Sequence, residues 1–155
     1  MRRLLRPAGG FTLIEILVVV AIVGIVLVVA TVNLMPDQAQ LARRDAAQLA
    51  LDIEQAREAA WFGGLPTAVS LADGRLRRWR FAGTTWESEA SKDRPLEGDT
   101  RVMSLHVDGE ALSPAERLVF MPDGLGTPFR VALELRGHRW AIEGDAAGAV
   151  KAVER

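Results

Sequence analysis

Residues 10–37 read GFTLIEILVVVAIVGIVLVVATVNLMPD, and this run sets the architecture of the chain. The 21 residues between Glu15 and Asp37 carry no charge, and the 22 residues from Phe11 to Val32 are apolar with few exceptions. Strands rarely exceed about ten residues. A helix of 22 residues is roughly 33 Å long, close to the hydrocarbon thickness of a bilayer. We therefore predict that residues 11–35 form a membrane-spanning helix.

Basic residues precede this apolar run. Arg2, Arg3 and Arg6 lie in the first ten residues, which contain no acidic side chain. Positive charge before a first span keeps that end of a protein in the cytoplasm. In a bacterial cell this predicts a single-pass protein of the inner membrane, with a cytoplasmic N-terminus and the rest of the chain in the periplasm.

The composition argues against several classes of protein. In 155 residues, 19 Lys and Arg oppose 20 Asp and Glu, so the net charge of −1 gives no reason to expect a nucleic-acid partner. The absence of Cys excludes disulfides and thiolate chemistry. His106 and His138 are distant in sequence, and Asp93, Glu97 and Asp99 lack the spacing of a calcium loop. We predict no catalytic residue, no cofactor and no metal site, and hence a protein that is not an enzyme.

Glu15 is the unusual residue of the apolar run. A carboxylate at the centre of a spanning helix costs about 2.5 to 3.5 kcal/mol, and less near the boundary. Either Glu15 reaches the headgroups from the helix end, or it has a cationic partner. Residues 10–15 read Gly-Phe-Thr-Leu-Ile-Glu after a short basic leader. This arrangement resembles the N-terminal signal of the type IV pilin and pseudopilin family, in which a leader ending in Gly precedes Phe-Thr-Leu-Ile-Glu and an apolar helix.

The resemblance implies a processing site and a set of partners. A prepilin peptidase would remove residues 1–10 by cutting between Gly10 and Phe11 on the cytoplasmic side, and would methylate the new amine of Phe11. Glu15 would neutralise the amine of a neighbouring subunit and so fix the register of a filament. The implied partners are the prepilin peptidase, other minor and major pseudopilins, and an inner-membrane assembly platform.

A second interpretation of the N-terminus is a secretory signal peptide that is removed after Ala30. Val28 and Ala30 suit the positions that signal peptidase inspects. The chain would then be a released binding domain or enzyme. The apolar run exceeds the usual 7 to 15 or so residues of such a peptide and continues past Ala30, which favours retention of the helix.

A second helix is predicted over residues 36–64. Pro36 removes a backbone donor and interrupts the first helix, so Asp37 is expected in the first turn of the next one. Gly63 and Gly64 end the helical pattern. Its apolar stripe, which we expect to pack on a head domain, consists of Leu41, Leu49, Ile53, Ala56 and Ala60.

Residues 65–155 contain short β-type runs separated by turns. We therefore predict an α+β protein, in which a long N-terminal helix is followed by a small antiparallel β-sandwich head. The polar residues 88–100 are expected to form a mobile surface loop. The predicted strands are Thr67–Leu71, Arg75–Phe81, Thr84–Ser88, Arg101–Val107, Arg117–Met121, Pro128–Leu135, His138–Glu143 and Ala149–Val153.

Residues 118–131, LVFMPDGLGTPFRV, carry a second resemblance. Asp123 and Gly124 are expected to make a turn, and Phe129 and Val131 share one side of the returning strand. The segment looks like the corresponding strand, turn and strand of the H-type minor pseudopilins of type II secretion systems. This resemblance implies a structural subunit of a periplasmic pseudopilus, in its tip complex. A minor pilin of type IV pili, with a related head, is the alternative.

Overall fold

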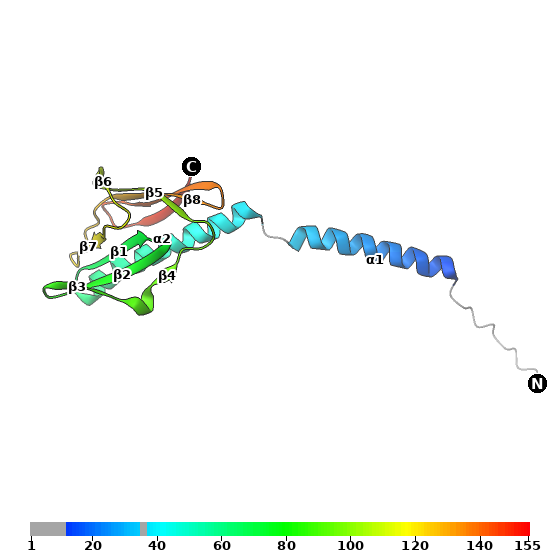
Figure 1. The fold of residues 1–155 in the computed structure, drawn as a ribbon, viewed down its shortest axis with the longest axis horizontal. Helices are drawn as coiled ribbons and strands as arrows, with labels where there is room; N and C mark the ends of the chain where they lie inside the picture. The colour runs from blue at the N-terminus through cyan, green and yellow to red at the C-terminus, as the bar shows by residue number, and fades with distance from the viewer. Residues whose placement is uncertain (1–11, 35–36) are drawn as a thin grey trace, which may run out of the picture. The chain divides into compact units, whose positions relative to one another are not determined.

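The computed structural model describes the backbone of residues 12–34 and 37–155, and the side chains of residues 12–28 and 37–155. The chain consists of two compact units, Met1–Pro36 and Asp37–Arg155. Figure 1 shows the helices and strands of both units.

Helix α1 (Leu13–Leu34) has 22 residues, and Glu15 is the charged residue of its sequence. The carbonyl of Thr12 accepts hydrogen bonds from the N–H groups of Glu15 at 3.0 Å and Ile16 at 3.3 Å, so Thr12 begins the helix. The large apolar side chains described in α1 are 48% to 85% exposed. Within the described part of the chain, no helix is both long enough and apolar enough to cross a membrane.

Helix α2 (Gln38–Gly63) is capped at both ends. Asp37 precedes the first turn and accepts a hydrogen bond from the N–H of Ala39 at 3.4 Å. It is therefore the N-cap of the helix, whereas the sequence predicted it to lie in the first turn. Gly64 adopts the left-handed conformation and donates to the carbonyl of Ala60, which confirms the predicted end. The buried apolar face of α2 consists of Ala42, Ala46, Leu49, Ala50, Ile53, Ala56 and Ala60.

The head contains two five-stranded antiparallel sheets, and the predicted α+β class is confirmed. In sheet A the order is β3-β2-β1-β7, with β4 also paired to β2; in sheet B the order is β10-β9-β8-β5-β6. Sheet A comprises β1 (Thr67–Ala72), β2 (Arg75–Ala82), β3 (Thr85–Ser88), β4 (Arg94–Pro95) and β7 (Leu118–Phe120). Sheet B comprises β5 (Arg101–Val107), β6 (Glu110–Leu112), β8 (Phe129–Leu135), β9 (His138–Gly144) and β10 (Val150–Glu154).

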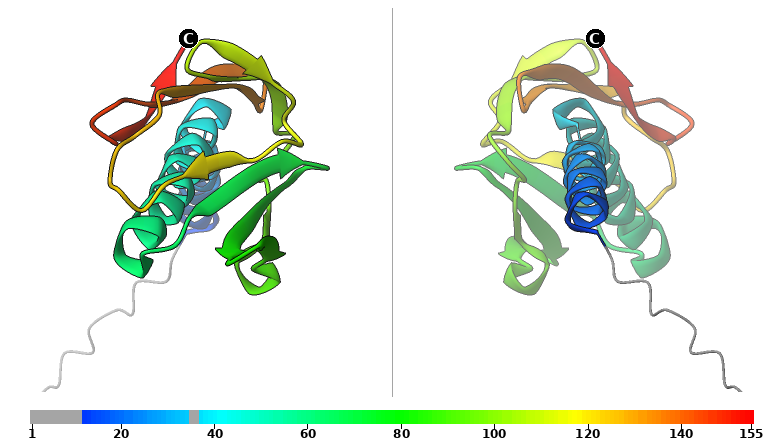
Figure 2. Two further views of the ribbon diagram at one scale, coloured as in Figure 1. Left: turned by 90° about the vertical axis from the view of Figure 1, so that its left-hand side faces the viewer. Right: turned by 90° about the vertical axis from the view of Figure 1, so that its right-hand side faces the viewer.

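Helix α2 lies between the two sheets and packs on both of them. It contacts β1 and β7 of sheet A and β8, β9 and β10 of sheet B, as the end-on views in Figure 2 show. The side chain of Thr67 donates to the carbonyl of Ala56 at 2.6 Å, which ties β1 to the helix. Phe120 and Phe129 join the sheets directly, with ring centroids 6.1 Å apart in an edge-to-face arrangement. One core therefore serves all three layers.

Residues 88–100, which were predicted to form a mobile surface loop, contain regular structure. This segment contains a 3-10 helix, η1 (Ala90–Lys92), and β4, which pairs with β2. Asp93 accepts a hydrogen bond from the N–H of Arg78 at 3.0 Å, and the N–H of Leu96 donates to the carbonyl of Gly74 at 2.8 Å. The side chains of Arg94 and Asp52 form an ion pair that joins the segment to α2. Polar and backbone groups of this segment are therefore bound by β2 and α2, whereas the polar composition alone suggested that they would be bound by water.

Candidate assembly and processing sites

The predicted processing site, Gly10 and Phe11, lies outside the described residues. Cleavage between them and methylation of Phe11 therefore stay predictions. Glu15 is described, and its backbone N–H is bound by both the carbonyl and the hydroxyl of Thr12. Its side chain is exposed, and no ion pair joins it to another residue in the described part of the chain.

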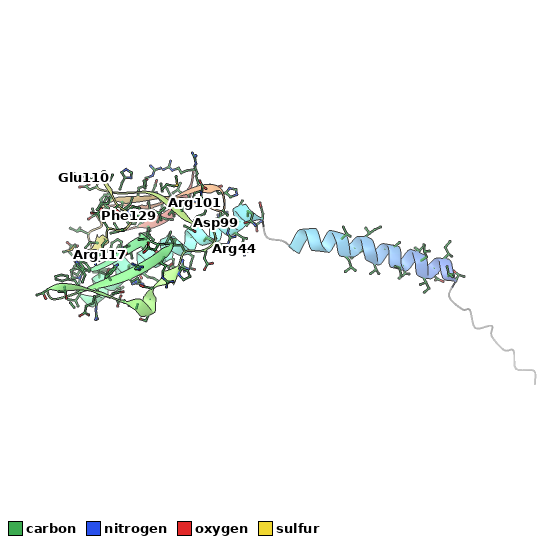
Figure 3. All side chains as sticks on the ribbon, in the orientation of Figure 1. Arg44, Asp99, Arg101, Glu110, Arg117 and Phe129 are labelled. Atoms are coloured by element: carbon green, nitrogen blue, oxygen red, sulfur yellow. The ribbon has the colours of Figure 1, made fainter. Side chains whose placement is uncertain are left out.

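The turn between β7 and β8 contains the second sequence motif. Asp123 accepts a hydrogen bond from the N–H of Leu125 at 3.0 Å, which closes the turn locally. Gly124 has a φ of 77°, as the predicted Asp-Gly turn requires. Phe129 and Val131 are both buried, at 6% and 0% exposure, which confirms that they share the inward side of β8; Figure 3 labels Phe129.

Two glycines outside the Asp-Gly turn allow this segment to pack closely on the loop after β9. A Cβ on Gly126 would lie 2.5 Å from the carbonyl oxygen of Asp145, and a Cβ on Gly144 would lie 2.0 Å from the ring of Phe129. The N–H of Gly126 also donates to the carbonyl of Ala146 at 3.3 Å. The motif therefore joins two loops and a buried ring, so its role is to hold the head together.

The same loop reaches helix α2 through Arg57. A Cβ on Gly148, whose φ is 86°, would lie 2.3 Å from Nη1 of Arg57. The sequence prediction missed this contact, because nothing in the local pattern relates residue 57 to residue 148. The sequence feature that could have indicated it is the pair of glycines, Gly144 and Gly148, in the short segment near the C-terminus.

Two models of known protein families match the chain. Residues 5–31 match the model described as the prokaryotic N-terminal methylation motif. Residues 45–148, more than half of the chain, match the model described as type II transport protein GspH. The chain belongs to the GspH family. No curated protein sequence matches it significantly.

Solved structures of the GspH type have the same fold at low sequence identity. Two structures of the minor pseudopilin EpsH from the type II secretion system of Vibrio cholerae are each 17% identical to the chain. They cover 76% and 72% of this chain, and 96% and 94% of their own chains, with TM-scores of 0.52 and 0.55. The solution structure of Escherichia coli GspH is 18% identical, covers 76% of this chain and 92% of its own, and has a TM-score of 0.56.

The GspH assignment supports the function of a minor pseudopilin in a type II secretion system. The family is one of structural pseudopilins, anchored in the inner membrane with a periplasmic head. The methylation motif and the family together imply processing and assembly with other pseudopilins. Of the two systems left open by the sequence, the match favours type II secretion over type IV pili.

The side chains considered for metal binding do not converge in this GspH-type head. His106 lies opposite Arg130 and His138 lies opposite Leu135, at opposite ends of β8. Asp93 accepts its hydrogen bond from the backbone of β2. Among the described residues no group of three or more His, Cys, Asp or Glu is placed to hold a metal ion.

Proposed function

We propose that this GspH-family chain is a minor pseudopilin in the pseudopilus tip complex, held in the inner membrane by residues 11–35. The observation that carries the proposal is the combination of two matches in one chain, a methylation motif at residues 5–31 and a GspH domain at residues 45–148. A released enzyme or binding domain does not need a methylation motif at its N-terminus. The GspH domain is described as a type II transport protein.

In this proposal residues 1–10 are a cytoplasmic leader. The prepilin peptidase cuts between Gly10 and Phe11 and methylates the amine of Phe11. The cut precedes the apolar run, so the anchor survives processing and the head, residues 65–155, stays attached to it through residues 36–64. Support comes from the uninterrupted Gly-Phe-Thr-Leu-Ile-Glu sequence and from the three arginines that keep the leader in the cytoplasm.

Glu15 acts as the assembly charge. In a medium of low dielectric constant an unpaired carboxylate is costly, and a nearby cationic amine stabilises it strongly. The amine of Phe11 on a neighbouring pseudopilin supplies that charge, so only one axial register satisfies both groups. The exposure of Glu15 and its lack of an ion partner among the described residues support this role.

The test is genetic complementation of secretion. Deleting the gene should stop the release of type II cargo into the medium, and the intact chain should restore it. A Gly10→Val variant, in which a branched side chain obstructs the peptidase cleft, should keep its leader and fail to restore release. Normal secretion without the chain, or full rescue by an unprocessed variant, would contradict the proposal.

A further inference from the structure

The outer side of sheet A, which faces away from α2, carries a cluster of aromatic side chains. The side chain of Arg78 in β2 donates to the carbonyl of Gln55 in α2 at 3.2 Å, so the next residue, Trp79, points to the outer side. Phe81 follows on that side, and Trp86 of β3 is its cross-strand partner. The rings of Phe81 and Trp86 meet edge to face, with centroids 5.3 Å apart. The three partly exposed rings therefore form one aromatic surface.

Arg117, which immediately precedes β7, lies against these rings. Its guanidinium carbon is 4.1 Å from the centroid of the Trp79 ring and 5.6 Å from that of Trp86; Figure 3 labels Arg117. The indole N–H of Trp79 donates to the hydroxyl of Ser70 at 3.0 Å, which fixes the ring under the guanidinium. A planar cation stacked on a fixed ring is held in one orientation before any partner arrives.

The charge of Arg117 has no acidic partner within the described part of the chain. No ion pair joins it to an Asp or Glu there. Its Nε atom is buried and has no hydrogen-bond partner. A buried donor without an acceptor destabilises a protein, and aromatic rings supply no strong acceptor for the N–H groups of a guanidinium. The acceptor that suits a guanidinium best is a carboxylate, which can bind two of its N–H groups at once.

The outer side of sheet A does not supply this carboxylate. Side chains alternate between the two sides of a strand, and none of the outward positions of β1, β2, β3, β4 and β7, all of which the structure describes, carries an Asp or Glu. Arg75 and Arg77 are outward in β2, and Arg77 pairs with Asp73 of the β1–β2 turn at 3.2 Å. Val119 of β7 adds a large apolar side chain that is 37% exposed. The surface is therefore apolar and positively charged.

We infer that this surface, here called the aromatic face and defined by Trp79, Phe81, Trp86, Arg117 and Val119, binds the head of a different pseudopilin. An exposed Asp or Glu of that partner pairs with Arg117, and apolar side chains around it cover the rings. Trp and Arg are the residues that most often dominate the centre of a protein interface. The class of partner rests on the proposed function, which gives the chain other pseudopilins as neighbours.

Other occupants fit the aromatic face less well. Two copies of this chain placed face to face would bring like charges together, because the face has no acidic outward position. A nucleic acid or an anionic lipid surface binds through many phosphate contacts. With Arg77 paired to Asp73, the face offers Arg75 and Arg117 for such contacts, beside apolar rings. One carboxylate within an apolar protein surface matches it better.

Carbodiimide crosslinking tests the inference directly, because it joins an amine to a carboxylate that is in contact with it. The full-length chain is produced with its secretion system, and the membranes are treated with a carbodiimide. Arg117→Lys places an amine at the centre of the aromatic face, so a new crosslink to an Asp or Glu of another pseudopilin is expected by mass spectrometry. Arg101→Lys, at an exposed position at the start of β5 in sheet B, is the matched control and should give none.

Charge exchange provides the second readout. Arg117→Glu should lower co-purification of the crosslinked pseudopilin about tenfold or more, because a carboxylate then faces a carboxylate. Changing the partner's crosslinked residue to Arg should restore the complex, which an unfolded head could not do. Arg101→Glu should change co-purification by less than about twofold.

Several results would overturn the inference. They are a complex that Arg117→Glu leaves intact, equal effects at Arg101 and Arg117, crosslinks only to secreted cargo or to a second copy, and co-purification of nucleic acid or lipid in place of a pseudopilin. Cargo release restored by the wild-type chain in the same cells tests the proposed function separately. Release without a crosslink to Arg117→Lys contradicts the inference alone, whereas absence of release contradicts the proposed function and the inference with it.

Discussion

The N-terminal helix and the head of this chain use apolar residues in opposite ways. Helix α1 exposes the large apolar side chains described in it, whereas the head has a core of Ile, Leu and Val residues that is buried between α2 and the two sheets. The head is therefore built for its own stability. The first helix is built for contact with something outside the chain, such as lipid or another subunit.

The largest expected effect concerns Glu15. Glu15→Val should abolish incorporation into the pseudopilus while leader cleavage continues, because the apolar helix remains and only the register charge is lost. The head is a separate compact unit, so its unfolding temperature should not change. Incorporation is measured by crosslinking to the other pseudopilins, with Glu15→Asp as the control that keeps the charge. Normal incorporation of the Glu15→Val variant would show that assembly through the N-terminal helix does not need this charge.

The stability of the head should depend more on the volume of its core than on its charges. Ile53 is fully buried on α2, so Ile53→Ala should lower the free energy of unfolding by about 2 to 5 kcal/mol. Leu51→Ala, at an exposed position of the same helix, should cost less than about 1 kcal/mol. Urea unfolding of the full chain in detergent, followed by tryptophan fluorescence, measures both. Equal losses would show that α2 is not embedded as the structure has it.

The close approach at Gly126 gives a smaller effect. A methyl group there meets the carbonyl of Asp145, so Gly126→Ala should cost about 1 to 3 kcal/mol. The matched control is Gly63→Ala, because a Cβ on Gly63 meets nothing within 4 Å. The same unfolding experiment compares them. A neutral Gly126→Ala variant would refute the packing role assigned to the turn motif.

The smallest of the four effects concerns the segment over residues 88–100. Arg94→Ala leaves the largely buried carboxylate of Asp52 with only the amide of Gln48, so the head should lose about 1 to 2 kcal/mol. Lys92→Ala removes an exposed pair with Glu89 and should cost less than about 0.5 kcal/mol. Hydrogen exchange of the Leu96 amide, which donates to the carbonyl of Gly74 beside β4, should rise in the first variant alone. Unchanged exchange would mean that Asp52 does not hold the segment.

The sequence predicted most of the fold because its signals are local. Apolar runs, the Pro36 break, the Gly63-Gly64 end and the Asp-Gly turns fix where helices and strands begin and end. The pairing of β4 and the presence of β6 were missed, because a two- or three-residue strand carries no periodic pattern. The contacts of Gly126 with Asp145 and of Arg57 with Gly148 were also missed, since they join residues distant in sequence.

The predictions for the processing and assembly residues came from a motif and not from packing. Glu15 could be singled out because a carboxylate in an apolar run is costly, and its context identified the family. The head fold of the GspH family does not by itself determine which surface residues bind a partner. The structure was needed to show which side of α2 the head buries and which side it leaves exposed.

The most direct test of the account is the mass of the mature chain recovered from the membranes of cells that make it. The account predicts a chain that begins at Phe11 with a methylated amine and retains the whole apolar run. A chain that begins at Thr31 and is found free in the periplasm would contradict it.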